Sequence, residues 1–174
     1  MATPVIAAAY RTPFGKKDGV FAETRSEDLS TTLIDHTLAE TGLTADHVDD
    51  LMWGVAQQRE EQDNNVARVI ALLSELGEGT PATTINRWCA SSMQAIISAS
   101  DAVAAGNRDA IIAGGVENMS RVEMGEDTYQ YLHPELSNEY NVFQLQMGMT
   151  AEKVASEYDV SREAQDEYAA RSHH

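Results

Sequence analysis

The sequence predicts an α/β fold in which helices cover both faces of a mainly parallel sheet. Short apolar segments at residues 5–10, 51–56, 83–85 and 109–113 are typical of buried strands. Between them lie three longer segments in which apolar residues recur at helical spacing. This alternation favours a parallel sheet, because consecutive parallel strands need a crossover connection, usually a helix. With 174 residues, the chain can form one domain, or one domain and part of another.

The first strand and helix are separated by a loop. The strand at 5–10 ends at Arg11-Thr12-Pro13, and residues 14–24 contain two glycines among charged residues. We expect Ser26 to cap the following helix and Gly42 to end it. One face of this helix is apolar: Leu29, Leu33, Ile34 and Leu38.

The second strand, at 51–56, precedes a helix that we expect Asp63 to cap. Gly77 and Gly79 mark its end. Its apolar face contains Val66, Val69, Ile70, Leu73 and Leu76.

The third strand, at 83–85, leads into the most apolar helix of the chain. Residues 89–105 contain no proline or glycine, and small or apolar side chains occupy most positions up to the stop at Gly106-Asn107. A helix that is apolar nearly all round is normally buried, so we expect it to run through the middle of a domain. The fourth strand, 109–113, ends at Gly114-Gly115, which tight packing explains better than phosphate binding.

Cys89, the only cysteine, is expected in the first turn of this central helix, at the carboxyl end of a strand. Open α/β sheets place their sites at such positions, and a helix start favours a reactive thiolate. The alternative is a buried cysteine that acts only as a small apolar side chain.

The chain changes character after Ser120. Residues 121–144 are polar and acidic without a clear period, which is typical of a functional lid or a linker. Thr150 and Ser161 are expected to cap two short helices, at 151–158 and 162–172.

Composition limits the classes of partner. Asp and Glu number 28 against 12 Lys and Arg, a net charge of −16, which disfavours nucleic acid and anionic membranes. No segment is a candidate membrane span or signal peptide, and a single cysteine makes a reducing cytoplasm the expected location. The acid excess also suggests a salt-adapted protein whose fold needs screening of its self-repulsion. His36 and His47 lack metal-ligand spacing, and no metal is expected.

Several stretches together resemble the thiolases, in particular the 3-ketoacyl-CoA thiolases. The segment 86–95, Asn-Arg-Trp-Cys-Ala-Ser-Ser-Met-Gln-Ala, is similar to the active-site cysteine segment of that family. Further matching stretches, in the family's order, are 8–15, 114–120, 147–152 and 161–166. The resemblance implies a thiolase-like half-domain at residues 1–118 and the beginning of a helical loop domain, or lid, at 119–174.

The resemblance also implies a reaction. Cys89 matches the nucleophile that forms an acyl-thioester while a 3-ketoacyl-CoA is cleaved to acetyl-CoA and a shortened acyl-CoA, or while the reverse condensation runs. Met147 matches a methionine beside the acyl-CoA thioester, although a core methionine is an equal alternative. Ser91-Ser92-Met93 follows the degradative type of cysteine segment, whereas Gln146 stands where some members have histidine. Coenzyme A enters as a substrate, with no separate cofactor, and needs a local basic patch on so acidic a protein. A homodimer or homotetramer is implied.

The other catalytic groups of the family are missing from this sequence. There is no second cysteine and no Gly-His-Pro or Asn-Glu-Ala-Phe segment; Leu132-His133-Pro134 is better explained as a surface turn. The 174 residues alone are therefore expected to be inactive. Either they are a fragment of a longer chain, or a complementary carboxy-terminal half comes from another polypeptide. Two alternatives remain open: a ketosynthase-type condensing enzyme, and a non-catalytic half-subunit that binds or scaffolds acyl-CoA enzymes.

Overall fold

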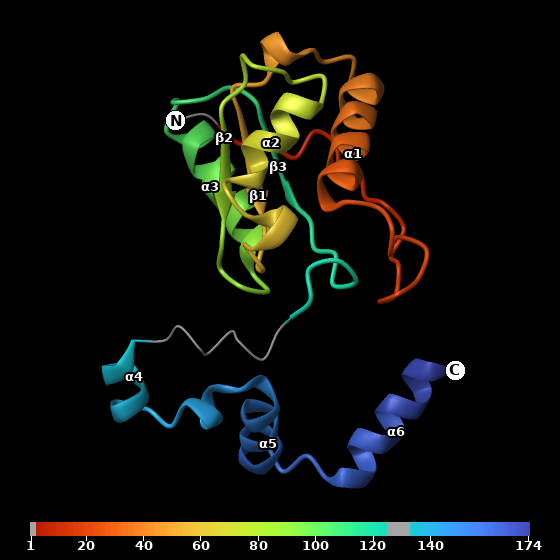
Figure 1. The fold of residues 1–174 in the computed structure, drawn as a ribbon, viewed down its shortest axis with the longest axis vertical. Helices are drawn as coiled ribbons and strands as arrows, with labels where there is room; N and C mark the ends of the chain where they lie inside the picture. The colour runs from red at the N-terminus through yellow and green to blue at the C-terminus, as the bar shows by residue number, and fades with distance from the viewer. Residues whose placement is uncertain (1–2, 125–132) are drawn as a thin grey trace. The chain divides into compact units, whose positions relative to one another are not determined.

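The computed structural model describes residues 3–124 and 133–174 (Figure 1). The chain divides into two compact units, Met1–Met124 and Gly125–His174. The first contains a sheet with helices and the second contains helices, so each is described by itself.

The sheet of the first unit has three parallel strands in the order β2-β1-β3. They are β1 (Asp50–Gly54), β2 (Ala82–Ile85) and β3 (Ile111–Gly115). Leu51 pairs with Ala82 on one side and with Ile112 on the other, so all carboxyl ends meet at one edge. The predicted α/β class with a parallel sheet is confirmed.

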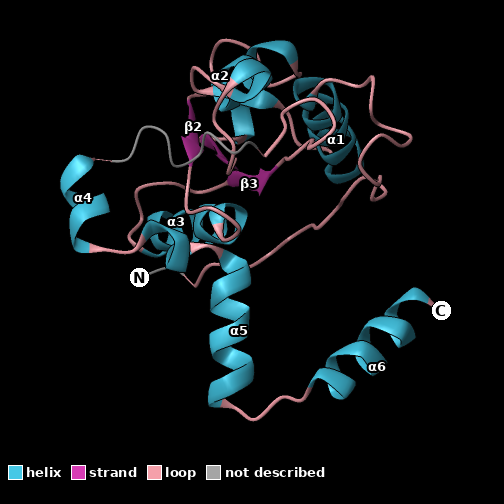
Figure 2. Ribbon diagram, turned by 60° about the horizontal axis from the view of Figure 1, so that its bottom comes forward, coloured by secondary structure: helices cyan, strands magenta, loops and turns pink. Residues whose placement is uncertain are grey.

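Helices lie on both faces of this sheet, as expected. The helix α2 (Val66–Leu73) connects β1 to β2, and α3 (Ser91–Ala104) connects β2 to β3 in the opposite direction. Right-handed crossovers in opposite directions place their helices on opposite faces. Figure 2 shows this arrangement, with α2 above the strands and α3 below them. The helix α1 (Ser26–Thr41) packs beside α2, and Gly42 ends it with a left-handed φ of 68°.

The main core lies between β1, α1 and α2. Its residues are aliphatic or aromatic and almost completely buried: Ile34, Leu38, Val48, Leu51, Trp53, Val55, Val66, Ala67, Ile70, Ala71 and Leu76. The apolar faces predicted for the first two helices supply much of it. Two short 3₁₀ helices, Ala45–His47 and Glu60–Gln62, complete the connections on this side.

The face of the sheet under α3 is covered by small side chains. The expectation that α3 is a buried central helix is wrong for the described residues. Only small side chains of α3 are buried, namely Ser91, Ala95 and Ala99. Met93 is 60% exposed and Ile97 is 45% exposed. A helix that is apolar on all sides needs a partner on each side, and the described residues supply only the sheet.

Several predicted element ends are wrong because tertiary contacts set them. Residues 5–10 form no strand and are mostly exposed, since they pair with no neighbouring strand. The cap of α1 is Arg25, and Ser26 is already helical; the Glu61 carboxylate accepts the Ser26 N–H instead. The cap of α2 is Asn65 rather than Asp63, and the helix ends at Leu73, before Gly77.

The second unit contains short helices: α4 (Pro134–Glu139), a 3₁₀ turn (Val142–Leu145), α5 (Met147–Glu157) and α6 (Arg162–His173). Ser161 caps α6 as predicted, accepting from the Ala164 N–H. Thr150 is no cap, because it lies inside α5, which begins at Met147. His133 caps α4; Leu132, named with it in the sequence, lies outside the described residues. None of the described helices could cross a lipid bilayer.

Candidate active site

Cys89 lies in the turn that joins β2 to α3, at the carboxyl edge of the sheet. It is exposed, so the alternative of a buried structural cysteine is wrong in this structure. The expected place inside the first helical turn is also wrong by a small margin: α3 begins at Ser91, after its cap Ala90. Cys89 therefore precedes the helix cap by one residue and remains next to the helix start.

The turn is held by side chains of its own segment. Trp88 has a left-handed backbone, with a φ of 49°, which costs free energy for a bulky residue. The Asn86 Oδ1 accepts the Trp88 N–H at 2.9 Å. The Ser91 hydroxyl accepts the Arg87 N–H at 2.8 Å and donates to the Trp88 carbonyl at 2.6 Å. These bonds fix the backbone on both sides of Cys89.

Glycines allow the start of α3 to lie directly on the sheet. A Cβ atom on Gly54, at the end of β1, would lie within 2.6 Å of the Ser92 Cα and closer still to the Ser91–Ser92 peptide. A Cβ atom on Gly115, at the end of β3, would collide with the Ser92 hydroxyl. On Gly114 it would lie 2.6 Å from the Trp53 ring, so tight packing explains Gly114-Gly115, as predicted.

A pocket of about 320 Å³ opens beside Cys89. It is lined from the ends of β1 and β3 and from the turn before α3: Gly54, Ala56, Gln57, Trp88, Cys89, Ser91, Ser92, Gly115, Val116, Glu117, Met119 and Met124. The thiol thus borders a hollow where sites of parallel sheets are normally found.

The strand ends around this pocket are connected through the backbone of one residue, Ala56. Its N–H donates to the Glu117 Oε2 at 3.0 Å, and its carbonyl accepts from the Asn86 Nδ2 at 3.0 Å. Glu117 is also held from behind, because its Oε1 accepts from the Gln62 Nε2 at 2.6 Å. Gln62 has no exposed surface and makes further bonds with Ser26, Gln57 and Asn118.

The charge at the pocket is negative and would repel a phosphate group. Among the described residues that line it, Glu117 is the only charged side chain, and there is no histidine, lysine or arginine. The described residues also contain no group of His, Cys, Asp and Glu that could hold a metal ion. The basic patch expected for coenzyme A is therefore not in this wall.

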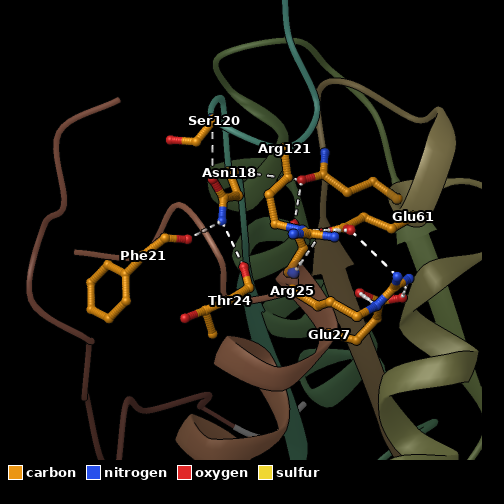
Figure 3. Close-up of polar contacts among 10 residues, drawn as sticks. Phe21, Thr24, Arg25, Glu27, Glu61, Asn118, Ser120 and Arg121 are labelled. Atoms are coloured by element: carbon orange, nitrogen blue, oxygen red, sulfur yellow. Dashed lines mark hydrogen bonds and ion pairs between the residues drawn. The ribbon is translucent and has the colours of Figure 1, made fainter. Parts of the chain in front are cut away.

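A second polar network holds the segment after β3 against the beginning of the chain (Figure 3). The Asn118 Nδ2 donates to the carbonyls of Phe21 and Thr24 at 3.0 and 2.9 Å. Figure 3 also shows Arg121 directed at Glu61, with an Nε–Oε2 distance of 2.8 Å. The network fixes the backbone that leads out of the Glu117 position.

The Glu61 carboxylate is buried within this network, with 7% of its side chain exposed. Burial alone raises the pKa of Glu61, but the Ser26 N–H, the bond from Arg121 and the charges of Arg121 and Arg25 together outweigh it. The pKa of Glu61 consequently lies below the ordinary value of a glutamate.

The other candidate residues lie away from Cys89 or in the second unit. The His36 ring packs edge-on against Tyr10, and His47 closes a capping box with Thr44. Met147 is the first residue of α5 and is 74% exposed. Its contact with a substrate stays a prediction.

Comparison with protein families decides the relationship of the chain. The family described as "Thiolase, N-terminal domain" matches residues 4–174. The chain belongs to the thiolase family. Its resemblance at the cysteine segment is therefore part of a similarity that extends over nearly its whole length.

Three relatives of this thiolase domain are each named 3-ketoacyl-CoA thiolase. The chain is 44% identical over 171 residues to a 3-ketoacyl-CoA thiolase of Pectobacterium carotovorum and 43% identical over 175 residues to one of Serratia proteamaculans. A 3-ketoacyl-CoA thiolase of Salmonella typhimurium is 44% identical. These alignments cover 97–99% of this chain but only 44–45% of each relative. The chain spans a little less than half the length of the curated relatives it matches.

Sequence reasoning found Cys89 but gave no role to the residues that hold its turn. Asn86 and Glu117 both lie in the quoted motifs, at the ends of predicted strands. An asparagine two residues before a backbone N–H that it can cap is a recognisable turn signal. Gln62 has no such signal, because its partners are distant in sequence.

Proposed function

We propose that this chain carries the nucleophile of a 3-ketoacyl-CoA thiolase, an acetyl-CoA C-acyltransferase. The single observation that carries the proposal is the exposed Cys89 thiol beside a pocket at the carboxyl edge of a parallel sheet. The names of the relatives supply the substrate class, 3-ketoacyl-CoA.

The reaction begins when the Cys89 thiolate attacks the 3-keto carbon of the substrate. The C2–C3 bond breaks, acetyl-CoA leaves as an enolate and takes up a proton, and the shortened acyl group stays on the sulfur as a thioester. The thiol of a second coenzyme A then attacks the acyl carbon and releases Cys89. The backbone N–H of Cys89 itself, beside the start of α3, is the expected donor to the oxyanion that forms at each attack.

This chain supplies the nucleophile but not the acid and base that the proton transfers need. The described residues around the pocket include no histidine, and Cys89 is the only cysteine of the chain. We therefore expect no steady-state thiolysis by the 174 residues, and we propose that a carboxy-terminal half completes the site. The exposed apolar side chains of α3, such as Met93 and Ile97, support a further protein surface there. A homodimer or homotetramer is part of the same proposal.

Acyl-enzyme formation tests the proposal without needing the complete cycle. The chain is incubated with acetoacetyl-CoA, quenched in acid, and its intact mass is measured. We expect an acetyl adduct on Cys89 in the wild type and none in Cys89→Ser under the same conditions. An acetyl adduct that persists in Cys89→Ser would contradict the nucleophile role. So would the absence of an adduct from the wild type, if a separate sample shows that iodoacetamide alkylates Cys89 and the thiol is therefore accessible.

A substrate contact of Met147 is proposed in addition. Met147→Ala should raise the acyl-CoA concentration that half-saturates acylation by about threefold to tenfold, because the proposed apolar contact with the bound acyl-CoA is lost. Met149→Ala, in the same helix α5, is the matched control and should leave the half-saturation unchanged. Equal shifts in the two variants would remove Met147 from the site.

The second candidate function is a non-catalytic half-subunit that binds acyl-CoA. The described residues that line the pocket include no histidine and no second cysteine, and this absence of the family's acid and base groups favours that candidate. Binding of acyl-CoA without any adduct on Cys89 would favour the scaffold over the enzyme. The ketosynthase-type alternative is disfavoured by the match to the thiolase family.

A further inference from the structure

The three strand ends around the pocket are joined at the backbone of Ala56. Ala56 follows β1, Asn86 follows β2, and Glu117 follows β3. Both backbone polar groups of Ala56 are used: the N–H donates to Glu117 and the carbonyl accepts from Asn86, each at 3.0 Å. The backbone of a single residue, Ala56, thus connects two side chains from different loops.

On the side of β2, the residue that bonds to Ala56 is Asn86, which lies three residues before Cys89. The same Asn86 side chain that donates to Ala56 accepts the Trp88 N–H at 2.9 Å. Trp88 has a left-handed φ of 49°. A strained residue keeps such a conformation only when its surroundings over-determine it. Asn86 therefore holds the residue that immediately precedes the thiol.

On the side of β3, the contact is anchored in the interior. The Glu117 carboxylate accepts from the Gln62 Nε2 at 2.6 Å, and Gln62 is completely buried with both polar atoms of its side chain bonded. A fully connected buried network is rigid. Because Gln62 holds the Glu117 carboxylate in place, Glu117 can hold the Ala56 N–H in place in turn, although part of Glu117 lines the pocket.

We propose that Asn86 and Glu117 are positioning residues for Cys89, which bond the carbonyl and the N–H of Ala56 and so fix the turn that carries the thiol. This inference rests on the proposed function of Cys89 as an acyl acceptor. Acyl transfer requires the sulfur and the oxyanion donors in one geometry, whereas alkylation by a small reagent requires only access to the thiolate.

The test compares these two reactions in the 174-residue chain. Asn86→Ala and Glu117→Ala should slow acetyl transfer from acetoacetyl-CoA by about tenfold to a hundredfold, because a displacement of the order of 1 Å has such an effect. The rate of iodoacetamide alkylation should change by less than about threefold, since the thiol stays accessible. Glu117→Gln keeps an acceptor for the Ala56 N–H and should recover much of the acetyl transfer.

The matched controls make the same kind of substitution elsewhere in the unit. Asn65 also has a left-handed backbone and bonds through both ends of its amide, to Ala82 and Thr84, away from the Cys89 turn. Asp49 accepts the N–H groups of Asp109 and Ala110 at the opposite edge of the sheet. Asn65→Ala and Asp49→Ala should leave the ratio of acetyl transfer to alkylation as in the wild type.

Equal ratios in the site variants and their controls would overturn the inference, and so would a parallel fall of both reactions. Amide hydrogen exchange gives a second measurement that needs no acyl transfer. The Trp88 amide should exchange at least about fivefold faster in Asn86→Ala than in Asn65→Ala. If the wild type forms no acyl-enzyme, the proposed function fails, and the exchange rate of the Trp88 amide then tests the positioning role by itself. Faster exchange in Asn86→Ala than in Asn65→Ala supports that role, and equal exchange overturns it.

Discussion

Two glycines at the strand ends bring the backbone of α3 into direct contact with the sheet. Gly54 and Gly115 leave no space for a Cβ atom, because the peptide and the hydroxyl of Ser92 occupy it. The place of Cys89, two residues before Ser91, is thereby tied to β1 and β3. At this scale the site depends on the absence of two methyl groups.

Gly54→Ala tests this contact. We expect the free energy of unfolding to fall by about 1–3 kcal/mol, because an inserted methyl forces rigid backbone apart. Gly79→Ala is the control, since a Cβ there meets no atom within 4 Å, and it should change stability by less than about 0.5 kcal/mol. Urea unfolding measures both. Equal losses would show that α3 moves away without cost.

At the scale of the elements, the two faces of the sheet are covered to different extents. On one face, α1 and α2 bury large side chains such as Ile34 and Ile70. On the other, α3 buries only small ones and leaves its own large side chains exposed. Figure 2 shows α3 beneath the strands, on the face opposite α2.

Two isoleucine substitutions separate these faces. Ile70→Gln, in α2, should lower the free energy of unfolding by about 3–5 kcal/mol, because it puts an unpaired amide into a closed core. Ile97→Gln, in α3, should change it by less than about 1 kcal/mol. Thermal unfolding of both variants is the measurement. A comparable loss in Ile97→Gln would mean that this face is buried in the chain in solution.

The buried Glu61 carboxylate joins α1, through the Ser26 N–H, to the segment after β3, through Arg121. It gives the free energy of unfolding a pH dependence. The pKa of Glu61 is lowered in the folded state, so the unfolded state binds more protons on acidification. This contribution is complete above the ordinary glutamate pKa of about 4.3 and is lost as the pH falls below it.

Glu61→Gln should therefore flatten the fall in the unfolding free energy between about pH 5 and pH 3. It should also lower stability at pH 7, where Arg121 and the Ser26 N–H lose an ionised acceptor. Glu40→Gln, at the exposed end of α1, is the control. An unchanged slope in Glu61→Gln would show that other carboxylates govern the acid transition.

At the scale of the whole chain, the net charge of −16 is the dominant property. Like charges repel over roughly a Debye length, about 10 Å at 0.1 M salt. We expect the melting temperature to rise by several degrees, on the order of 5 °C, between low salt and molar KCl. Sucrose is the control, because it stabilises folded proteins by its exclusion from their surface and does not screen charge. A melting temperature indifferent to KCl would exclude salt adaptation.

The fold class followed from periodicity, but the element ends did not. Strand–helix alternation predicted the parallel sheet, and the gaps between apolar segments located β1, β2 and β3 to within about two residues. Residues 5–10 have the same apolar character and form no strand, since hydrogen-bonding to a neighbour decides whether a segment is a strand. Caps such as Arg25 and Asn65 depend on contacts from distant residues.

The sequence by itself determined the family, the α/β class and the one candidate nucleophile, because local patterns and a single cysteine carry that information. Only the tertiary structure decided that Cys89 is exposed beside a pocket, that α3 keeps an apolar face uncovered, and that Asn86 and Glu117 meet on Ala56. The reason is physical: hydrogen bonds and packing between residues some 30 to 60 positions apart leave no periodic trace along the chain.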